Sequence, residues 1–60
     1  MDVYEAEGLV FEIKTMSYKL NKEEEDFIIS IEQQISEDRD LSASQSRRLN
    51  EIYDKVIVGG

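Results

Sequence analysis

Carboxylates are the most numerous groups in this 60-residue sequence that could do chemistry. Four of them form one block, Glu23, Glu24, Glu25 and Asp26, and others are scattered at Glu5, Glu7, Glu12, Glu37, Asp38 and Asp40. Paired carboxylates can transfer protons or hold a metal ion. However, the sequence contains no DxDxDG-type oxygen-ligand loop, and so short a chain offers no deep pocket. We therefore expect no enzyme, no catalytic residue, no metal site and no cofactor.

The acidic block itself has two interpretations. Negative side chains in the first turn of a helix interact favourably with the helix dipole, and this alone can account for the block. Alternatively, carboxylates spaced over a small surface can imitate phosphates and occupy the basic groove of a nuclease or repair enzyme. In that case the protein would be an acidic DNA-mimic inhibitor of a nucleic-acid-processing or defence enzyme. Its partner-binding residues would then be Glu23, Glu24, Glu25 and Asp26.

Two adjacent arginines, Arg47 and Arg48, stand in the stretch "LSASQSRRLNEIYDKV" at residues 41–56. Guanidinium groups bind phosphates and carboxylates well. Domains that bind nucleic acid normally carry surplus positive charge, whereas this chain has a formal charge of −7. Direct contact with nucleic acid is therefore disfavoured, and a protein partner is favoured. The simpler alternative is a solvated helix face on which the arginines pair with Glu51.

The composition limits how this chain can be stabilised. It has no cysteine and no histidine, which excludes disulfides and the common zinc ligand sets. A domain of this size buries only about 60 % of its unfolded surface, so it depends on helix packing or on assembly, and a homo-oligomer stays open. No apolar run approaches the roughly 18 residues of a membrane span. With no secretion signal at the N-terminus, we expect no membrane contact and a cytoplasmic location.

The N-terminal third is the least clearly patterned part of the sequence. Residues 1–8 are acidic and end at Gly8, which would weaken a helix interior by about 1 kcal/mol, so we expect a flexible acidic lead-in. A first helix is predicted over residues 9–20. Its apolar stripe consists of Leu9, Ile13, Met16 and Leu20. The segment "LVFEIKT" could also form a short strand, but the stripe continues beyond it and favours a helix.

Two further helices, over residues 22–36 and 43–57, have clearer starts. Asn21 with Glu24, and Ser42 with Gln45, have the spacing of a capping box. Their predicted buried faces are Phe27, Ile28, Ile31 and Ile35 on one helix, and Leu49, Ile52, Tyr53, Val56 and Ile57 on the other. Ile29 and Phe11 lie off the apolar faces and are candidates for exposed contacts. Gly59 and Gly60 are expected to stop the last helix.

Three amphipathic helices with short connections predict an all-α fold, a small three-helix bundle forming a single domain over residues 9–60. On the third helix the polar side faces away from the apolar stripe. This outward side, which we predict to bind a protein partner, carries Gln45, Arg47, Arg48, Glu51 and Lys55. The tyrosines Tyr4, Tyr18 and Tyr53 are scattered rather than interleaved with basic residues, unlike those of single-strand binders. The sequence thus favours a non-catalytic interaction module.

A resemblance to a known family spans residues 20–57. It consists of "FIISI" at residues 27–31, a charged loop, "LSASQ" at residues 41–45, and then Leu49, Ile52 and Tyr53. In these features the chain resembles the small helical domain that accompanies the UvsW helicase in T4-like phages. The resemblance implies a compact helical bundle that acts as an accessory factor near phage recombination or replication machinery. It implies no catalytic residue.

Overall fold

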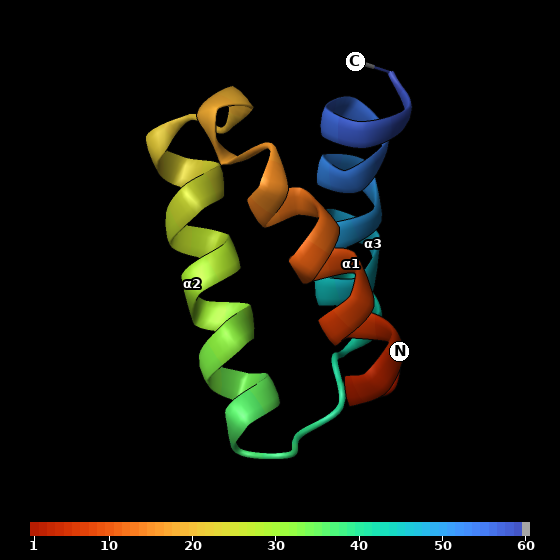
Figure 1. Ribbon diagram of the computed structural model, residues 1–60. Coiled ribbons are helices and arrows are strands. Elements are labelled where there is room, and N and C mark those ends of the chain that lie inside the picture. Colours follow the sequence, from red (N-terminus) through yellow and green to blue (C-terminus); the bar gives the residue numbers. More distant parts are fainter. Residues whose placement is uncertain (60) are drawn as a thin grey trace.

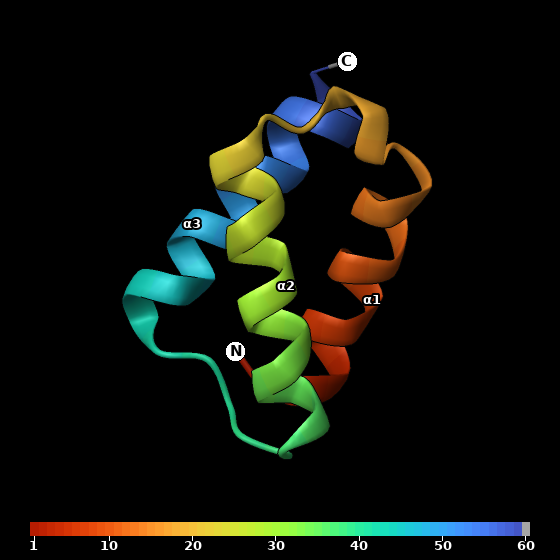
Figure 2. The ribbon, with the colours of Figure 1, turned by 90° about the vertical axis from the view of Figure 1, so that its left-hand side faces the viewer.

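The computed structural model describes residues 1–59 and folds them into three α-helices without a strand. The helices are α1 (Val3–Thr15), α2 (Lys22–Ser36) and α3 (Ala43–Tyr53). A 3₁₀ turn, η1 (Ser17–Lys19), joins α1 to α2, a loop joins α2 to α3, and a π-helical turn, η2 (Asp54–Val58), follows α3. The chain runs up α1, down α2 and up α3 (Figure 1). Helix α1 packs against both α2 and α3, and in the side view α2 lies nearest the viewer (Figure 2). The prediction of a small all-α three-helix bundle is confirmed.

Helix α1 differs most from the sequence-based expectation. It begins at Val3 rather than at residue 9, because the Asp2 side chain caps it and accepts the backbone N–H of Glu5 at 2.8 Å. Residues 3–8 are therefore helical, and the predicted lead-in over residues 1–8 is wrong for them. Gly8 is tolerated inside the helix because Ala6, two residues earlier, is fully buried in the core. The helix also ends at Thr15, before the predicted limit of residue 20.

The other two helices begin where the capping boxes predict. Both boxes are formed, at Asn21 with Glu24 and at Ser42 with Gln45. The bounds of α2 match the predicted range of 22–36. The predicted range of 43–57 is α-helical only to Tyr53 and continues as η2. Gly59 terminates η2, as expected, whereas Gly60 lies outside the described residues.

The core draws on all three helices, on η2 and on one loop residue. Its buried members are Ala6, Val10, Ile13, Ile28, Ile31, Leu41, Leu49, Ile52 and Val56. Of these, Ala6, Val10 and Leu41 were not predicted from the sequence. Leu41 is held there by its backbone N–H, which donates to the Met1 carbonyl at 2.9 Å. The buried side of α1 therefore differs from the predicted apolar stripe. Of that stripe only Ile13 is buried, whereas Leu9, Met16 and Leu20 are half-buried at the rim of the core.

The end of α2 contains the one non-glycine residue with a positive φ among residues 1–59, Asp38 at 58°. Around it the Arg39 N–H donates to the Gln34 carbonyl at 3.1 Å, and the Asp38 N–H donates to the Ile35 carbonyl at 2.9 Å. This pair of bonds is a Schellman motif, which normally places glycine at the left-handed position. Asp38 therefore occupies a conformation that glycine adopts more readily.

Candidate functional site

The two surfaces predicted from the sequence meet along one line. Arg48 of α3 contacts Glu23 of α2 at 3.3 Å, and Lys55 contacts Glu24 at 2.9 Å. The acidic block and the polar side of α3 were predicted as two alternative partner-binding surfaces. Within the chain they are joined to each other by these ion pairs. We call this line the α2–α3 seam and define it by Glu23, Glu24, Gln34, Gln45, Arg48 and Lys55.

Glu24 is the most constrained charged group of the seam. Only 9 % of its side chain is exposed, and both of its carboxylate oxygens accept from the Nζ of Lys55 at 2.9 Å. It also accepts the Asn21 backbone N–H at 3.0 Å. The hydrogen bond from Lys55, followed by the one from Asn21, lowers the pKa of Glu24 below its ordinary value. Glu24 is therefore held as a carboxylate that closes the edge of the core.

Gln45 is also occupied within the chain. Its Oε1 accepts the Ser42 N–H at 2.9 Å, and its amide exchanges hydrogen bonds with that of Gln34 at 2.8 and 3.1 Å. Arg48 lies 5.9 Å from the centroid of the Phe27 ring and pairs with Glu23 rather than with Glu51. Of the five residues predicted to bind a partner, three belong to the seam, whereas Arg47 and Glu51 are simply exposed.

The acidic groups do not gather on one surface. In the acidic block Asp26 pairs with Lys22 at 3.3 Å, in addition to the two seam pairs. The second cluster of acids, at residues 37–40, follows the opposite end of α2, about 22 Å away for a 15-residue helix. There Glu37 pairs with Arg39 at 2.6 Å. Among residues 1–59 no three acidic side chains lie close enough together to hold a metal ion.

Aromatic side chains mark a different surface, on α1. Of three tyrosines and two phenylalanines, Tyr4, Phe11 and Tyr18 are strongly exposed. Tyr4, Gly8 and Phe11 are spaced i, i+4 and i+7 and so share one side of α1, opposite the buried side. We call these three residues the α1 face. Phe11 was predicted to be exposed, whereas Tyr4 could not be assigned to the same side because a helix that starts at residue 9 does not include it.

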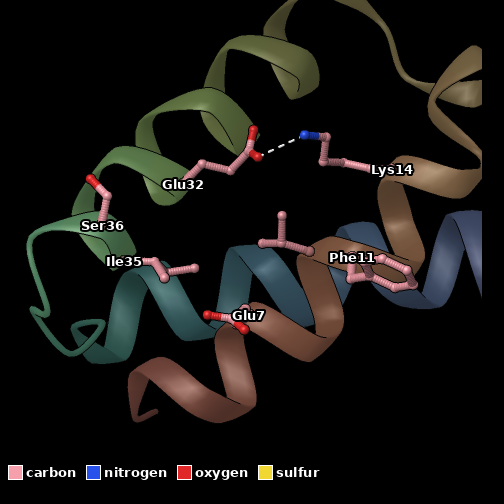
Figure 3. Close-up of a pocket in the computed structure, with 7 residues that line it drawn as sticks. Glu7, Phe11, Lys14, Glu32, Ile35 and Ser36 are labelled. Carbon is pink, nitrogen blue, oxygen red and sulfur yellow. Dashed lines mark hydrogen bonds and ion pairs between the residues drawn. The ribbon is translucent and has the colours of Figure 1, made fainter.

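A groove of about 390 Å³ lies beside the α1 face, between α1 and α2. Its lining residues are Glu7, Val10, Phe11, Lys14, Glu32, Ile35 and Ser36. Figure 3 shows Lys14 and Glu32 joined across one end, where the Lys14 Nζ lies 2.8 Å from the Glu32 carboxylate. Phe11, which is 71 % exposed, belongs to both the groove and the α1 face. The groove can accept an apolar side chain from outside the chain.

The surroundings of the α1 face are acidic. Glu5, Glu7 and Glu12 are exposed on α1, and the only basic residue of this helix, Lys14, is paired with Glu32. Glu12 accepts the hydroxyl of Tyr53 at 2.8 Å, and this hydrogen bond raises the pKa of Tyr53. Tyr53, predicted to lie on the buried face of the third helix, is partly buried against the core, and its hydroxyl reaches Glu12 on α1.

No protein family, curated protein or solved structure matches this chain in the comparisons with known proteins. Each helix within residues 1–59 is too short or too polar to cross a membrane. The surfaces described above must therefore be interpreted from their own geometry.

Proposed function

We propose that this protein is a small, non-catalytic interaction module that binds a partner protein through the α1 face and the adjoining groove. The observation that carries the proposal is the exposure of Phe11, at 71 %, on the edge of an apolar groove. Burying a phenylalanine stabilises a protein by about 1.5–3 kcal/mol relative to leaving it in water. In a 60-residue domain with a small core, that unused contribution supports a role for Phe11 outside the fold.

The arrangement has the features of a binding hot spot. Aromatic residues next to a pocket are the commonest anchors of protein interfaces, and a surrounding rim of polar groups excludes water from them. Here Val10 and Ile35 supply the apolar lining, while Glu7 and the Lys14–Glu32 pair supply polar groups at its border. The groove, about 390 Å³ in volume, is large enough to take one or two side chains of a partner.

The resemblance at residues 20–57 supports a particular setting for this binding. We propose an accessory factor of phage-type recombination or replication machinery. The alternative, an acidic DNA-mimic inhibitor of a nucleic-acid-processing enzyme, has less support. Within the block, Glu23, Glu24 and Asp26 already pair with cations of the chain itself. Carboxylates neutralised in this way imitate phosphates poorly.

The test is affinity capture from a lysate of the source cells with identification by mass spectrometry, using wild type and two matched variants. Phe11→Ser removes the anchor, and Val58→Ser removes a side chain of similar exposure, 70 %, from η2. We expect the same partner to be captured by wild type and Val58→Ser and lost by Phe11→Ser. Circular dichroism should show that both variants keep their helices, because neither side chain is in the core.

Two outcomes would count against this function. If Phe11→Ser captures the partner as well as wild type does, the α1 face is not the binding surface. If capture instead yields a nuclease and depends on the exposed acid Glu25, tested with Glu25→Lys, the inhibitor is the correct function. An Arg47→Ala variant tests the exposed part of the face predicted on α3, and we expect it to capture normally.

A further inference from the structure

Gly8 has no structural purpose within the described chain. It is exposed in α1, and a Cβ added there would meet no neighbouring atom within 4 Å. Its φ is not positive, so the backbone conformation does not need glycine either. A glycine inside a helix lowers the stability of that helix relative to alanine. The residue is thus unfavourable for folding, and its missing side chain leaves open space on the outer surface.

The open space at Gly8 lies between two exposed aromatic side chains. Gly8 lies one turn after Tyr4 and one turn before Phe11, so the α1 face is a notch between two aromatic rings. The distance between two packed helices depends on the side chains at their contact, and glycine allows the shortest approach. An amphipathic helix laid against a groove is also a common mode of protein recognition.

Charge identifies the kind of helix that would fit. Glu5 and Glu12 flank the notch on one side and Glu7 on the other, in a chain of formal charge −7. A second copy of this chain would bring the same negative charges into contact and be repelled. A helix with lysines and arginines beside its apolar stripe would be attracted instead.

We propose that a basic, amphipathic α-helix of a partner protein crosses α1 at Gly8. One of its apolar side chains enters the groove beside Phe11, and its cations face Glu5, Glu7 and Glu12. This inference rests on the proposed function, since it specifies the partner of the same surface.

The test uses a displayed library of helical peptides selected on the purified full chain. Every peptide has apolar residues at i, i+4 and i+7, and its flanking positions vary among Lys, Arg, Glu and Asp. We expect enrichment of Lys and Arg at the flanks. In NMR titrations with the best binder, the shifted amides should lie in residues 4–15 and 32–36. Enrichment of acidic flanks, or shifts centred on another surface, would overturn the proposal.

Gly8→Ala provides the decisive variant because folding and binding should change in opposite directions. Its melting temperature should rise, by about 4–8 °C for a domain of this size, while its affinity for the selected peptide should fall by about tenfold. A loss of binding by a more stable protein cannot come from unfolding. Unchanged or tighter binding by Gly8→Ala would show that no helix crosses at this position.

The possible failures are distinguishable. If no peptide is selected but capture of a partner still depends on Phe11, the helical partner is wrong and the proposed function stands. If capture does not depend on Phe11, both are wrong. If light scattering shows a dimer that Phe11→Ser dissociates, the occupant is a second copy of the chain, and the inference of a basic helix is overturned.

Discussion

The α2–α3 seam and the α1 face differ in what their side chains have left to offer a partner. In the seam, Glu24 and Lys55 satisfy each other, and the amides of Gln34 and Gln45 do the same. On the α1 face, Tyr4 and Phe11 lie in solvent beside a groove. The side chains of the seam are therefore used internally, whereas the α1 face leaves two aromatic rings exposed.

The difference has a simple electrostatic and hydrophobic origin. An exposed ion pair stabilises a protein by about 0–1 kcal/mol, and its two opposite charges largely cancel in the field that an incoming molecule meets. An exposed aromatic ring retains its full tendency to leave water. A surface with charges of both signs is thus well suited to joining two helices of one chain, and an apolar surface with an acidic border is better suited to binding another protein.

The largest effect should come from the core that supports both regions. Leu49 of α3 is fully buried, and Leu49→Asp would place an unpaired carboxylate among apolar side chains. We expect this variant to unfold, since the core of so small a domain supplies only about 3–5 kcal/mol. Far-UV circular dichroism and thermal melting measure the outcome, with Arg47→Ala as the exposed control on the same helix. A Leu49→Asp protein with the wild-type melting temperature would contradict the core assignment.

The next largest effect should separate the seam from the α1 face. Lys55→Met leaves the buried Glu24 without its cation, and we expect a loss of about 1–2 kcal/mol in unfolding free energy. The more exposed pair between Lys22 and Asp26 is the control, and Lys22→Met should change stability by less than about 0.5 kcal/mol. Urea denaturation measures both. Partner capture through Phe11 should survive in Lys55→Met, and its loss would show that the two regions are not independent.

The pH dependence of the unfolding free energy should report on the interaction between Glu24 and Lys55. Because Lys55 and Asn21 lower the pKa of Glu24 in the folded chain, its value lies below that of the unfolded chain, about 4.3. Its stabilising contribution is complete above the unfolded value and is lost as the pH falls through the folded value. The stability advantage of wild type over Glu24→Gln should therefore stay constant from about pH 7 down to about pH 5 and shrink as the pH falls below about 4.3. A difference that stays constant below that value as well would exclude Glu24 as the titrating group.

The smallest effect should be a gain in stability, in the loop that leads from α2 to α3. Asp38→Gly relieves the left-handed conformation at φ 58°, and we expect a gain of about 0.5–1 kcal/mol. Asp40→Gly, in the same loop but without a positive φ, should gain nothing. Both are measured by thermal melting. Asp38→Gly should leave partner binding unchanged, whereas Gly8→Ala should weaken it. If Asp38→Gly also weakens binding, then the gain in stability itself, and not the added methyl group at residue 8, reduces the affinity for the partner.

The sequence by itself determined the features that depend on neighbouring residues. The start and end of α2, the start of α3 and the burial of Ile28, Ile31, Leu49 and Ile52 all followed from caps three residues apart and from helical spacing. These signals act within one or two turns, so they can be recognised without knowing what packs against the helix. The expected exposure of Ile29 and Phe11 rested on the same spacing, and the structure agrees.

The start of α1 also follows from a local cap, Asp2 accepting from Glu5, which the predicted start at residue 9 overlooked. Only the tertiary structure decided that the helix continues through Gly8 and which of its side chains the neighbouring helices bury. Local sequence argued against a helix through Gly8, but burial of Ala6 and Val10 against the other helices outweighs that local cost. The pairing of Arg48 with Glu23 and of Lys55 with Glu24 joins residues 25 and 31 positions apart, which no local pattern specifies. The groove beside Phe11 likewise exists only because α2 packs against α1, since a groove between two helices is a property of their packing and not of either sequence.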